Sequence, residues 1–416
     1  MKQFLNKEKI NDILFMLLII FPITTLIQGL PVLEYINKVM IGLVIILLSI
    51  KVFFTNITIK NIIILSLTAI VYIFSFIHTK GNIENINTIF YFGLWILLFI
   101  YLKDNYKEFL EINNKKLILI KYVVIMWNIL VLVSLFYNNS FVSEWDGKYF
   151  CSFSNGCHRF ASSCIFIFFL NFILRNKSKE KKYSILFLIP YISVFFSGAR
   201  IYLILIILSG VSILYCLCKN KKDFIISTIL LIIISLILVL FTPMGEKFIS
   251  SLNLNMRKSN FVDNTNIEEG EAEIIEEESE TKVLINSITS GRTIFWEADI
   301  KGYLNLNPLK KLVGNGYNYV YDINEKAAGV RIYAHNDILN IILNYGLIGT
   351  FIYLYVFMDY ILTFIKSKKI SILLLLAFIG IYFSNAMINQ VYTYVCCVFS
   401  IPFILYCYSL RKYKKF

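Results

Sequence analysis

The sequence predicts an all-α, polytopic membrane protein with about twelve transmembrane helices. Of its 416 residues, 58% are hydrophobic and only 16% are charged, whereas roughly 25% are charged in an ordinary soluble domain. The apolar residues are gathered in stretches close to the length of a bilayer crossing, about 20 residues. One long polar segment interrupts them late in the chain. These observations exclude a water-soluble enzyme.

The apolar stretches give the helices in order. The first follows Lys2, Lys7 and Lys9, but no small-residue cleavage site comes after it, so we expect an uncleaved helix. The shortest stretches, 160–174 and 183–198, flank a basic run. The predicted helices cover residues 12–29, 38–54, 61–77, 86–102, 117–137, 160–174, 183–198, 201–218, 224–242, 337–365, 370–388 and 392–410.

The basic residues indicate the orientation of this bundle. If the N-terminus is cytoplasmic, the inner loops receive most lysines and arginines, including the run from Arg175 to Lys182 and the tail from Arg411 to Lys415. Positive residues are retained on the cytoplasmic side during insertion. We therefore expect a multi-pass protein of the inner (cytoplasmic) membrane with both termini in the cytoplasm. The net charge of +13 then reflects topology, and no nucleic-acid partner is expected.

The predicted organisation has three parts: helices one to nine in 1–242, an extracytoplasmic loop in 243–336, and helices ten to twelve with a basic tail in 337–416. Long loops in compact proteins usually carry function. Glutamates crowd the first half of the loop, so we expect a solvated acidic spacer at 263–281. Aromatic residues and helical periodicity predict a folded part at 286–336 that covers the mouth of the bundle.

The folded part of the loop begins with a predicted helix. Ser290 lies near its start, and Arg292, Trp296 and Asp299 share one side of it at spacings of four and three. We expect Pro308 to end this helix.

Two further motifs follow in the same loop. Gly314 and Gly316 predict a tight turn, which either approaches a ligand closely or is a plain turn. His335 stands at the outer start of the tenth helix, where it is either a structural group or a proton acceptor. Imidazole accepts a proton near neutral pH, as the activation of a sugar hydroxyl requires.

Arg200 lies between two apolar runs at the outer mouth, where a guanidinium is costly unless it pairs or lines a wet cavity. The alternative is an arginine that reaches the lipid headgroups. Together with Arg292 and Arg331 it can form a cationic cradle for a diphosphate, because the planar guanidinium matches phosphate oxygens bidentately. Arg159 is a further candidate.

The eight cysteines show no Cys/His spacing typical of a metal site, so we expect no metal and no cofactor. Cys151 and Cys157 lie in one outer loop, where they either pair or stay reduced.

Three stretches together resemble the O-antigen ligase and O-antigen polymerase superfamily of bacterial surface polysaccharide assembly: FFSGARIYLILIILSG, SGRTIFWEADIKGYLNLNPLKKLVGNGYNYVY and AHNDILNIILNYGLIGTFIYL. Their order and spacing match the family's Ser-x-Arg turn, Arg-x-x-x-Trp helix, Gly-x-Gly segment and His-Asn helix over 183–218 and 288–357. The loop CSFSNGCHRFA is similar to the family's Phe-x-Asn-Pro-Asn stretch but lacks proline and has Cys157 and His158 where asparagine is usual.

The resemblance implies a GT-C-like membrane glycosyltransferase that is metal-independent and inverting. It would move undecaprenyl-diphosphate-linked glycan to a glycan or lipid-core acceptor at the outer leaflet, with a chain-length regulator and a flippase as further partners. Carried over by motif, Arg200 and Arg292 would bind phosphate and His335 would be the essential histidine. The substrate-binding candidates are Arg331, Arg159, Asn336, Trp296, Gly314 and Gly316.

Several functions stay open at this point. The shared motifs do not separate an O-antigen or capsule polymerase from a ligase that builds lipopolysaccharide. We favour the polymerase because the chain is rich in Ile, Lys, Asn and Phe, as in organisms of AT-rich genome, many of which make capsules. A lipid-linked oligosaccharide flippase also needs buried cations, but we find no convincing repeat between the two halves. A structural or signalling protein predicts no cluster of Arg and His at one mouth.

Overall fold

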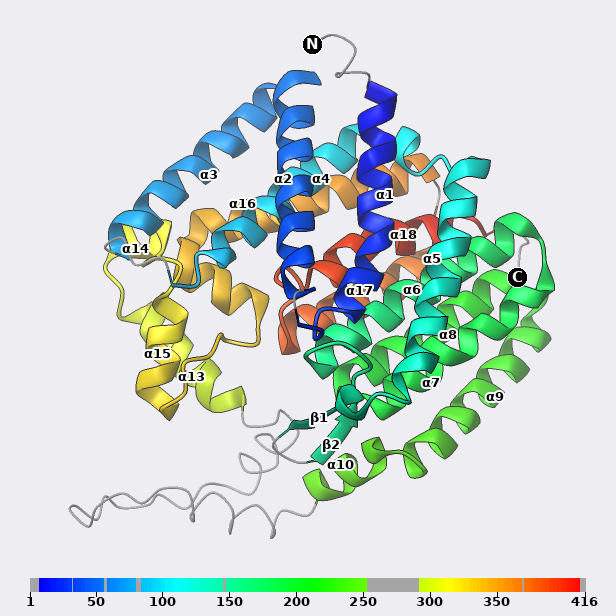
Figure 1. Cartoon of the computed structure of the whole chain (residues 1–416). Helices are drawn as coiled ribbons and strands as arrows, with labels where there is room; N and C mark the ends of the chain where they lie inside the picture. Colours follow the sequence, from blue (N-terminus) through cyan, green and yellow to red (C-terminus); the bar gives the residue numbers. More distant parts are fainter. Residues whose placement is uncertain are drawn as a thin grey trace, which may run out of the picture.

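The computed structural model describes residues 7–31, 33–55, 58–79, 84–144, 147–252, 292–368 and 370–411. The predicted acidic spacer at 263–281, Ser290 and the last residues of the basic tail lie outside the described residues. Figure 1 shows a bundle of long helices, with α13 (Arg292–Leu304), α14 (Pro308–Val313) and α15 (Tyr319–Ala328) of the polar segment gathered beside it.

All twelve predicted apolar stretches are helical. Within the described residues, nine helices are long and apolar enough to cross a membrane, and three shorter apolar helices fill the remaining stretches, Lys182–Phe196, Ile372–Ile388 and Val395–Ser409. The all-α, polytopic membrane fold is therefore confirmed. The helices are α1 (Lys7–Leu26), α2 (Glu34–Thr55), α3 (Ile59–His78), α4 (Asn87–Phe109), α5 (Asn114–Ser134), α6 (Cys157–Ser178), η2 (Lys181–Phe187), α7 (Leu188–Phe196), α8 (Arg200–Leu217), α9 (Lys221–Leu240), α16 (Asp337–Lys368), α17 (Ile372–Ile388) and α18 (Val395–Ser409).

The loops between these helices carry smaller elements. Between α5 and α6 lie η1 (Asn138–Ser140) and an antiparallel hairpin of β1 (Phe141–Glu144) and β2 (Gly147–Phe150). The described parts of the polar segment form α10 (Pro243–Leu252), α13 (Arg292–Leu304), α14 (Pro308–Val313) and α15 (Tyr319–Ala328).

The role expected of Pro308 was wrong. Helix α13 already ends at Leu304, and Pro308 lies in the first turn of α14. The missing N–H of a proline costs nothing in the first turn, and the side chain of Asn307 caps the helix by accepting from the backbone N–H of Lys310.

Burial differs sharply along the bundle. Helix α6 is almost entirely buried, whereas almost no residue of α9 is buried, and α9 lies at the edge of the bundle in Figure 1. Stacked aromatic pairs join α4 to α16, with 4.5 Å between the ring centroids of Phe92 and Tyr345 and also between those of Trp95 and Tyr353. An exposed helix as apolar as α9 suits a lipid surface.

The segments that the charge pattern assigns to the outer side lie together at one end of the bundle. The N–H of Gly29 donates to the carbonyl of Phe153 at 2.8 Å, which joins the α1–α2 and α5–α6 connections. Arg331 pairs with Glu84 of the α3–α4 connection at 3.2 Å. Each of these two contacts joins segments that the charge pattern assigns to the same side.

Contacts at the opposite end join segments assigned to the inner side. Asn11 Nδ2 donates to Glu108 Oε2 at 3.1 Å, and Lys103 pairs with Asp359 at 2.7 Å. If one predicted helix were spurious or missing, the contacts described here would join segments assigned to opposite sides.

The two glycines of the Gly-x-Gly motif fit against a break in α16. Gly346 has φ +69° and ψ −169° inside this helix, and the N–H of Asn315 donates to the freed carbonyl of Leu343 at 3.0 Å. A Cβ on Gly314 would lie 2.2 Å from the carbonyl oxygen of Asn344, and one on Gly316 would lie 2.8 Å from Thr79 Cγ2. The space that these glycines leave is therefore filled by the protein's own backbone and side chains.

We predict that Gly346→Ala destabilises the fold whereas Gly380→Ala does not. A Cβ at 346 would lie 2.3 Å from the carbonyl oxygen of Leu312 in a left-handed backbone conformation, while a Cβ at 380 meets nothing within 4 Å. Backbone strain of this kind costs about 1–3 kcal/mol, which corresponds to a fall of several degrees in the melting temperature. Thermal unfolding in detergent measures both variants, and equal melting temperatures would contradict the packing described here.

Candidate functional site

Arg200, Arg292 and His335 lie at the outer-assigned end of the bundle, with Arg292 near both of the others. Burial lowers the pKa of Arg292, and Arg200 is near enough to lower it further. The pKa of His335 is lowered to about 2 by burial, then by the charge of Arg292 and by His158. Arg292 is therefore within electrostatic range of both Arg200 and His335, and His158 is within range of Arg292 and His335.

Two helix starts lie in this cluster. Arg200 is the first residue of α8 and His158 lies in the first turn of α6, while Arg292 lies in the first described turn of α13. The positive ends of the α6 and α8 dipoles add to the charges of Arg200 and Arg292, so the arrangement repels cations and attracts anions. The cluster is therefore suited to a strongly anionic group such as a phosphate or diphosphate.

A tight turn directs Arg200 into this cluster. Gly198 has φ +66°, and a Cβ there would lie 2.3 Å from the ring of Tyr149 in β2. Only glycine adopts this conformation without strain in so little space. The Ser-Gly-Ala-Arg motif therefore ends α7 and starts α8 at the arginine.

His335 lies in a short connection before α16, which we name the strap (residues 330–336). Its φ of +51° is left-handed, a conformation that costs a non-glycine residue energy and often marks a functional site. Asn336 holds the next turn, because its Oδ1 accepts from the N–H groups of Ile338 at 2.9 Å and Leu339 at 3.1 Å. Asn336 thus caps α16 and fixes the point at which the strap, with His335, joins the helix.

Trp296 holds the strap from the side of α13. Its Nε1 donates to the carbonyl oxygen of Ala334 at 2.8 Å, directly before His335. Asn324 of α15 donates from Nδ2 to the carbonyl oxygen of Ile332 at 3.0 Å. The Arg-x-x-x-Trp motif therefore places Arg292 in the cluster and uses Trp296, one turn later, to position the histidine.

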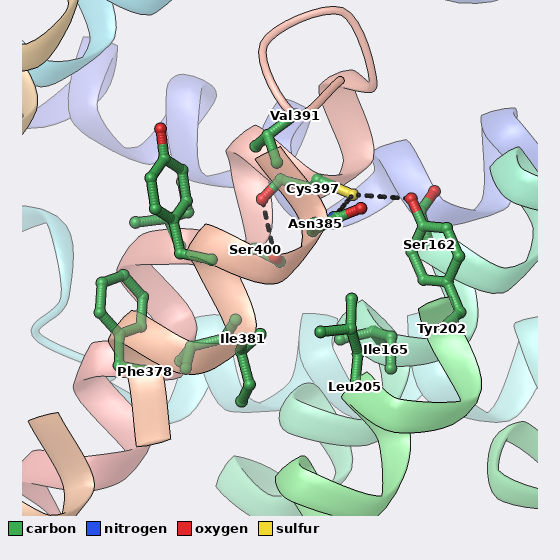
Figure 2. A pocket seen from close by; sticks show the side chains of 13 residues that line it. Ser162, Ile165, Tyr202, Leu205, Phe378, Ile381, Asn385, Val391, Cys397 and Ser400 are labelled. Atoms are coloured by element: carbon green, nitrogen blue, oxygen red, sulfur yellow. Dashed lines mark hydrogen bonds between the residues drawn. The ribbon is translucent and has the colours of Figure 1, made fainter. Parts of the chain in front are cut away.

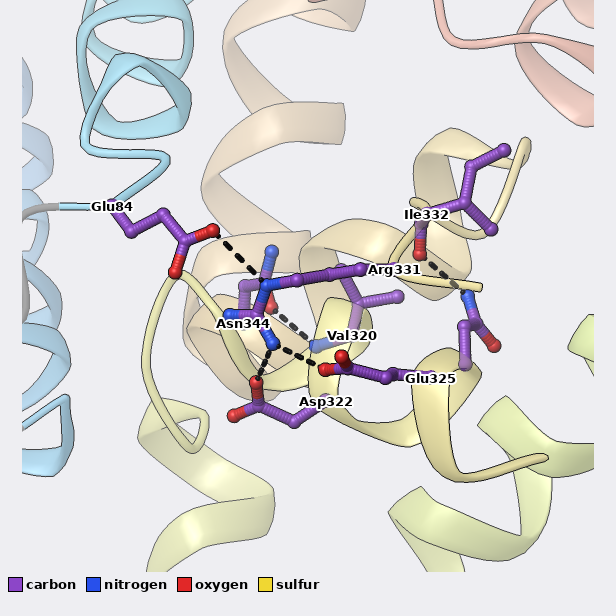
Figure 3. Close-up of polar contacts among 8 residues, drawn as sticks. Glu84, Val320, Asp322, Glu325, Arg331, Ile332 and Asn344 are labelled. Atoms are coloured by element: carbon purple, nitrogen blue, oxygen red, sulfur yellow. Dashed lines mark hydrogen bonds and ion pairs between the residues drawn. The ribbon is translucent and has the colours of Figure 1, made fainter. Parts of the chain in front are cut away.

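Arg331 lies in the strap but is engaged by carboxylates. Figure 3 shows its guanidinium bonded to Asp322 at 2.8 Å, Glu325 at 2.7 Å and Glu84 at 3.2 Å. The hydrogen bond to Glu325 is the largest cause that raises the pKa of Arg331. Its charge is already compensated, so the structure uses Arg331 to fasten the strap to α15 and to the α3–α4 connection. Neither Arg331 nor the packed Gly314 and Gly316 joins the cationic cluster.

Asp299 shares a side of α13 with Arg292 and Trp296, yet it adds no negative charge to the cluster. The side chain is fully buried, and burial raises its pKa to about 8. At neutral pH most of this carboxyl group is therefore protonated.

Arg159 stands at the edge of the cluster. It donates from Nη1 to Asn155 Oδ1 at 2.7 Å. Burial raises the pKa of Tyr333, and both Arg292 and Arg159 oppose that rise, so Arg159 is also near the strap. The neighbouring Cys157 forms a disulfide with Cys151, with 5.1 Å between their Cα atoms. This disulfide ties the end of β2 to the first residue of α6, beside His158.

Sequence reasoning missed two tyrosines at the cluster. Tyr333 lies two residues before His335, with 4.3 Å between their ring centroids. Its hydroxyl lies 3.0 Å from that of Tyr394, in the α17–α18 connection. Tyr394 is separated from His335 by two transmembrane helices, so no local motif could have linked them.

A cavity lies inside the bundle between α6, α8, α17 and α18, and Figure 2 shows the side chains around it. Its polar groups are partly paired, because Tyr202 and Asn385 both contact Cys397 Sγ at 3.3 Å. Most of the lining is apolar. The lining residues are Ser162, Ile165, Tyr202, Leu205, Phe378, Ile381, Tyr382, Asn385, Val391, Cys397, Ser400, Ile401 and Ile404.

Comparison with known proteins identifies the region that contains the cluster. Residues 185–354 match the family described as O-antigen ligase. The match includes Arg200, Arg292 and His335, and it confirms the resemblance to the O-antigen ligase and polymerase superfamily. No curated protein matches the chain.

We predict that Trp296→Phe loosens the strap while Trp127→Phe does not. Each substitution removes one indole hydrogen bond, from Trp296 to Ala334 at 2.8 Å or from Trp127 to Ser163 Oγ at 3.3 Å. A net loss of about 1 kcal/mol corresponds to roughly fivefold faster amide exchange in residues 330–336. Hydrogen exchange read by mass spectrometry tests this, and unchanged protection of the strap in Trp296→Phe would show that the bond does not hold it.

Proposed function

We propose that this protein, whose residues 185–354 belong to the O-antigen ligase family, polymerises undecaprenyl-diphosphate-linked repeat units as a membrane glycosyltransferase of the GT-C type. One observation carries the proposal: Arg292 lies within electrostatic range of both Arg200 and His335, at the end of the bundle that the charge pattern assigns to the outside. The proposed setting is the outer leaflet of the cytoplasmic membrane, with both termini inside. The three-part division at 1–242, 243–336 and 337–416 belongs to the same proposal.

The arginines would hold the diphosphate of the donor. Two guanidinium groups so close together repel each other, and burial already disfavours the charge of Arg292. A diphosphate between Arg200 and Arg292 would remove this repulsion and accept bidentate hydrogen bonds. The arginines would then stabilise the charge that develops on the leaving diphosphate, which is the task that a metal ion performs in other transferases.

His335 would act as the general base in a single displacement. The acceptor hydroxyl oxygen attacks the anomeric carbon as its proton passes to the imidazole. The bond from that carbon to the diphosphate oxygen breaks, and its electron pair leaves with the lipid diphosphate. Attack opposite the leaving group inverts the anomeric configuration.

Donor binding would also restore the basicity of His335. In the free protein its pKa of about 2 keeps the imidazole neutral but makes it a weak base. Burial and the positive charge of Arg292 are the two largest causes. A diphosphate bound to Arg292 cancels that charge and raises the histidine pKa toward the range useful for catalysis.

An O-antigen ligase is the alternative, since the matched family carries that description and the same residues would serve it. The two enzymes differ in the acceptor, a growing glycan or a lipid core. A chain-length regulator and the flippase that supplies the donor are the proposed partners. A flippase activity for the protein itself would require movement of the lipid without a new bond.

Purified protein in lipid nanodiscs or vesicles, given lipid-linked repeat units, tests these alternatives. Longer glycan chains support the polymerase. Transfer to an added lipid core supports the ligase, and movement between leaflets without new glycosidic bonds supports a flippase and refutes the transferase.

We predict that Arg200→Ala, Arg292→Ala and His335→Ala each lower the transfer rate by about 100-fold or more, because each removes a group that acts on the reacting atoms. Lysine at 200 or 292 should restore only part of the rate, since a point charge lacks the guanidinium fork. Arg175→Ala is the matched control, because this arginine bonds Ser184 at 2.7 Å at the other end of α6. A normal rate in any of the three alanine variants would remove that residue's proposed role.

A further inference from the structure

Partly exposed tyrosines from distant parts of the chain lie in the strap and around it. We name them the tyrosine group: Tyr91, Tyr321, Tyr333 and Tyr394. They come from α4, α15, the strap and the α17–α18 connection, respectively. The mechanism proposed above uses none of them.

Contacts tie the tyrosine group to the cluster. The hydroxyls of Tyr333 and Tyr394 lie 3.0 Å apart, and the rings of Tyr333 and His335 have centroids 4.3 Å apart. Tyr321 is near enough to both Tyr333 and Tyr91 to interact electrostatically with them. The group therefore extends from the proposed base along the outer end of the bundle.

The tyrosine group is more exposed than the tyrosines inside the core, while Tyr91 and Tyr394 pack against the edge of that core and Tyr321 packs against a smaller apolar cluster. Tyr345 and Tyr353 are fully buried and stack on neighbouring rings at 4.5 Å between centroids. Each member of the tyrosine group keeps part of its surface exposed. Within the described part of the chain, no ring contact joins two members of the group, so their faces are not used to pack against one another.

Arg159 borders the same group. It acts electrostatically on Tyr91, Tyr333 and Tyr394, which belong to three different elements. The group thus combines aromatic faces, phenol hydroxyls and a guanidinium. Aromatic walls with a few polar groups are typical of small-molecule binding sites.

We propose that the tyrosine group is the subsite for the acceptor glycan and binds the less polar faces of its sugar rings. The ring of a tyrosine packs against the C–H face of a pyranose, and its hydroxyl hydrogen-bonds the hydroxyls at the rim of the sugar. A sugar held on Tyr333 presents a hydroxyl beside His335. Arg159 bonds further hydroxyls and borders the subsite. This inference rests on the proposed function and specifies how that function selects its acceptor.

The test measures two ligands separately on the full chain in nanodiscs. One probe is the soluble oligosaccharide repeat unit released by mild acid from the lipid-linked pool of the cells that make the protein. The other is undecaprenyl diphosphate without sugar. The variants are Tyr333→Leu and Tyr321→Leu, which remove a ring, and Tyr333→Phe, which keeps the ring. Tyr137→Leu is the matched control, because Tyr137 is a partly exposed outer tyrosine that packs on Phe153 instead.

We expect both leucine variants at the tyrosine group to weaken oligosaccharide binding about tenfold, or about 1.4 kcal/mol, and to leave binding of undecaprenyl diphosphate unchanged. Tyr333→Phe should weaken oligosaccharide binding much less, and Tyr137→Leu should bind the oligosaccharide as tightly as the unaltered protein does. Arg292→Ala should show the reverse pattern. If Tyr333→Leu does not fold, the oligosaccharide affinity of Tyr321→Leu alone decides whether the subsite exists.

Unchanged oligosaccharide binding in the leucine variants overturns the subsite, and so does an equal loss of both ligands. Failure of the proposed function gives a different result. If the protein binds the oligosaccharide through these tyrosines but forms no glycosidic bond, the transferase proposal fails and the subsite stands. If transfer proceeds with an unchanged acceptor KM in the leucine variants, the subsite fails and the transferase stands.

Discussion

The mutual repulsion of two partly exposed guanidinium groups, Arg200 and Arg292, is the constraint on which the rest of this site depends. Arg200 is held near enough to Arg292 to disfavour its charge, and Arg292 in turn disfavours a positive charge on His335. Such an arrangement costs folding free energy and persists only when packing over-determines it. The packing is visible in the strap, which is fixed by Trp296, Asn324, Asn336 and the three carboxylates on Arg331.

The same constraint explains why so much of the described segment between α9 and α16 packs in a way that holds the strap in place. The α16 break at Gly346 receives the backbone around Gly314, and this docks α14 against α16 and α3. Helices α13 and α15 then pack on α16 beside the strap, as Figure 1 shows. A loop that merely covered the mouth of the bundle would not need such close backbone contacts. Its described part holds the strap before and after Tyr333 through the hydrogen bonds of Trp296 and Asn324.

Hydrophobicity and charge were sufficient to predict the helices, because a bilayer demands apolar stretches of fixed length and retains lysines on one side. Motif order likewise predicted which cations converge. Spacing could not distinguish Arg331 from Arg292, since only the fold decides that three carboxylates reach one of them. It also could not show that the Gly-x-Gly turn packs into α16, or that Tyr394 meets Tyr333, because those contacts join segments far apart in sequence.

One residue, Arg292, links binding to chemistry in the proposed site. Its charge is among the causes that hold the pKa of His335 near 2, so the empty site contains a poor base. In the proposed mechanism the anion that neutralises Arg292 would be the donor itself. Base strength would then rise when a diphosphate is in place, and an acceptor hydroxyl beside Tyr333 would be activated when there is an anomeric carbon to attack. A protein that placed its histidine away from the arginines would lack this coupling and would need a separate device to coordinate the two substrates.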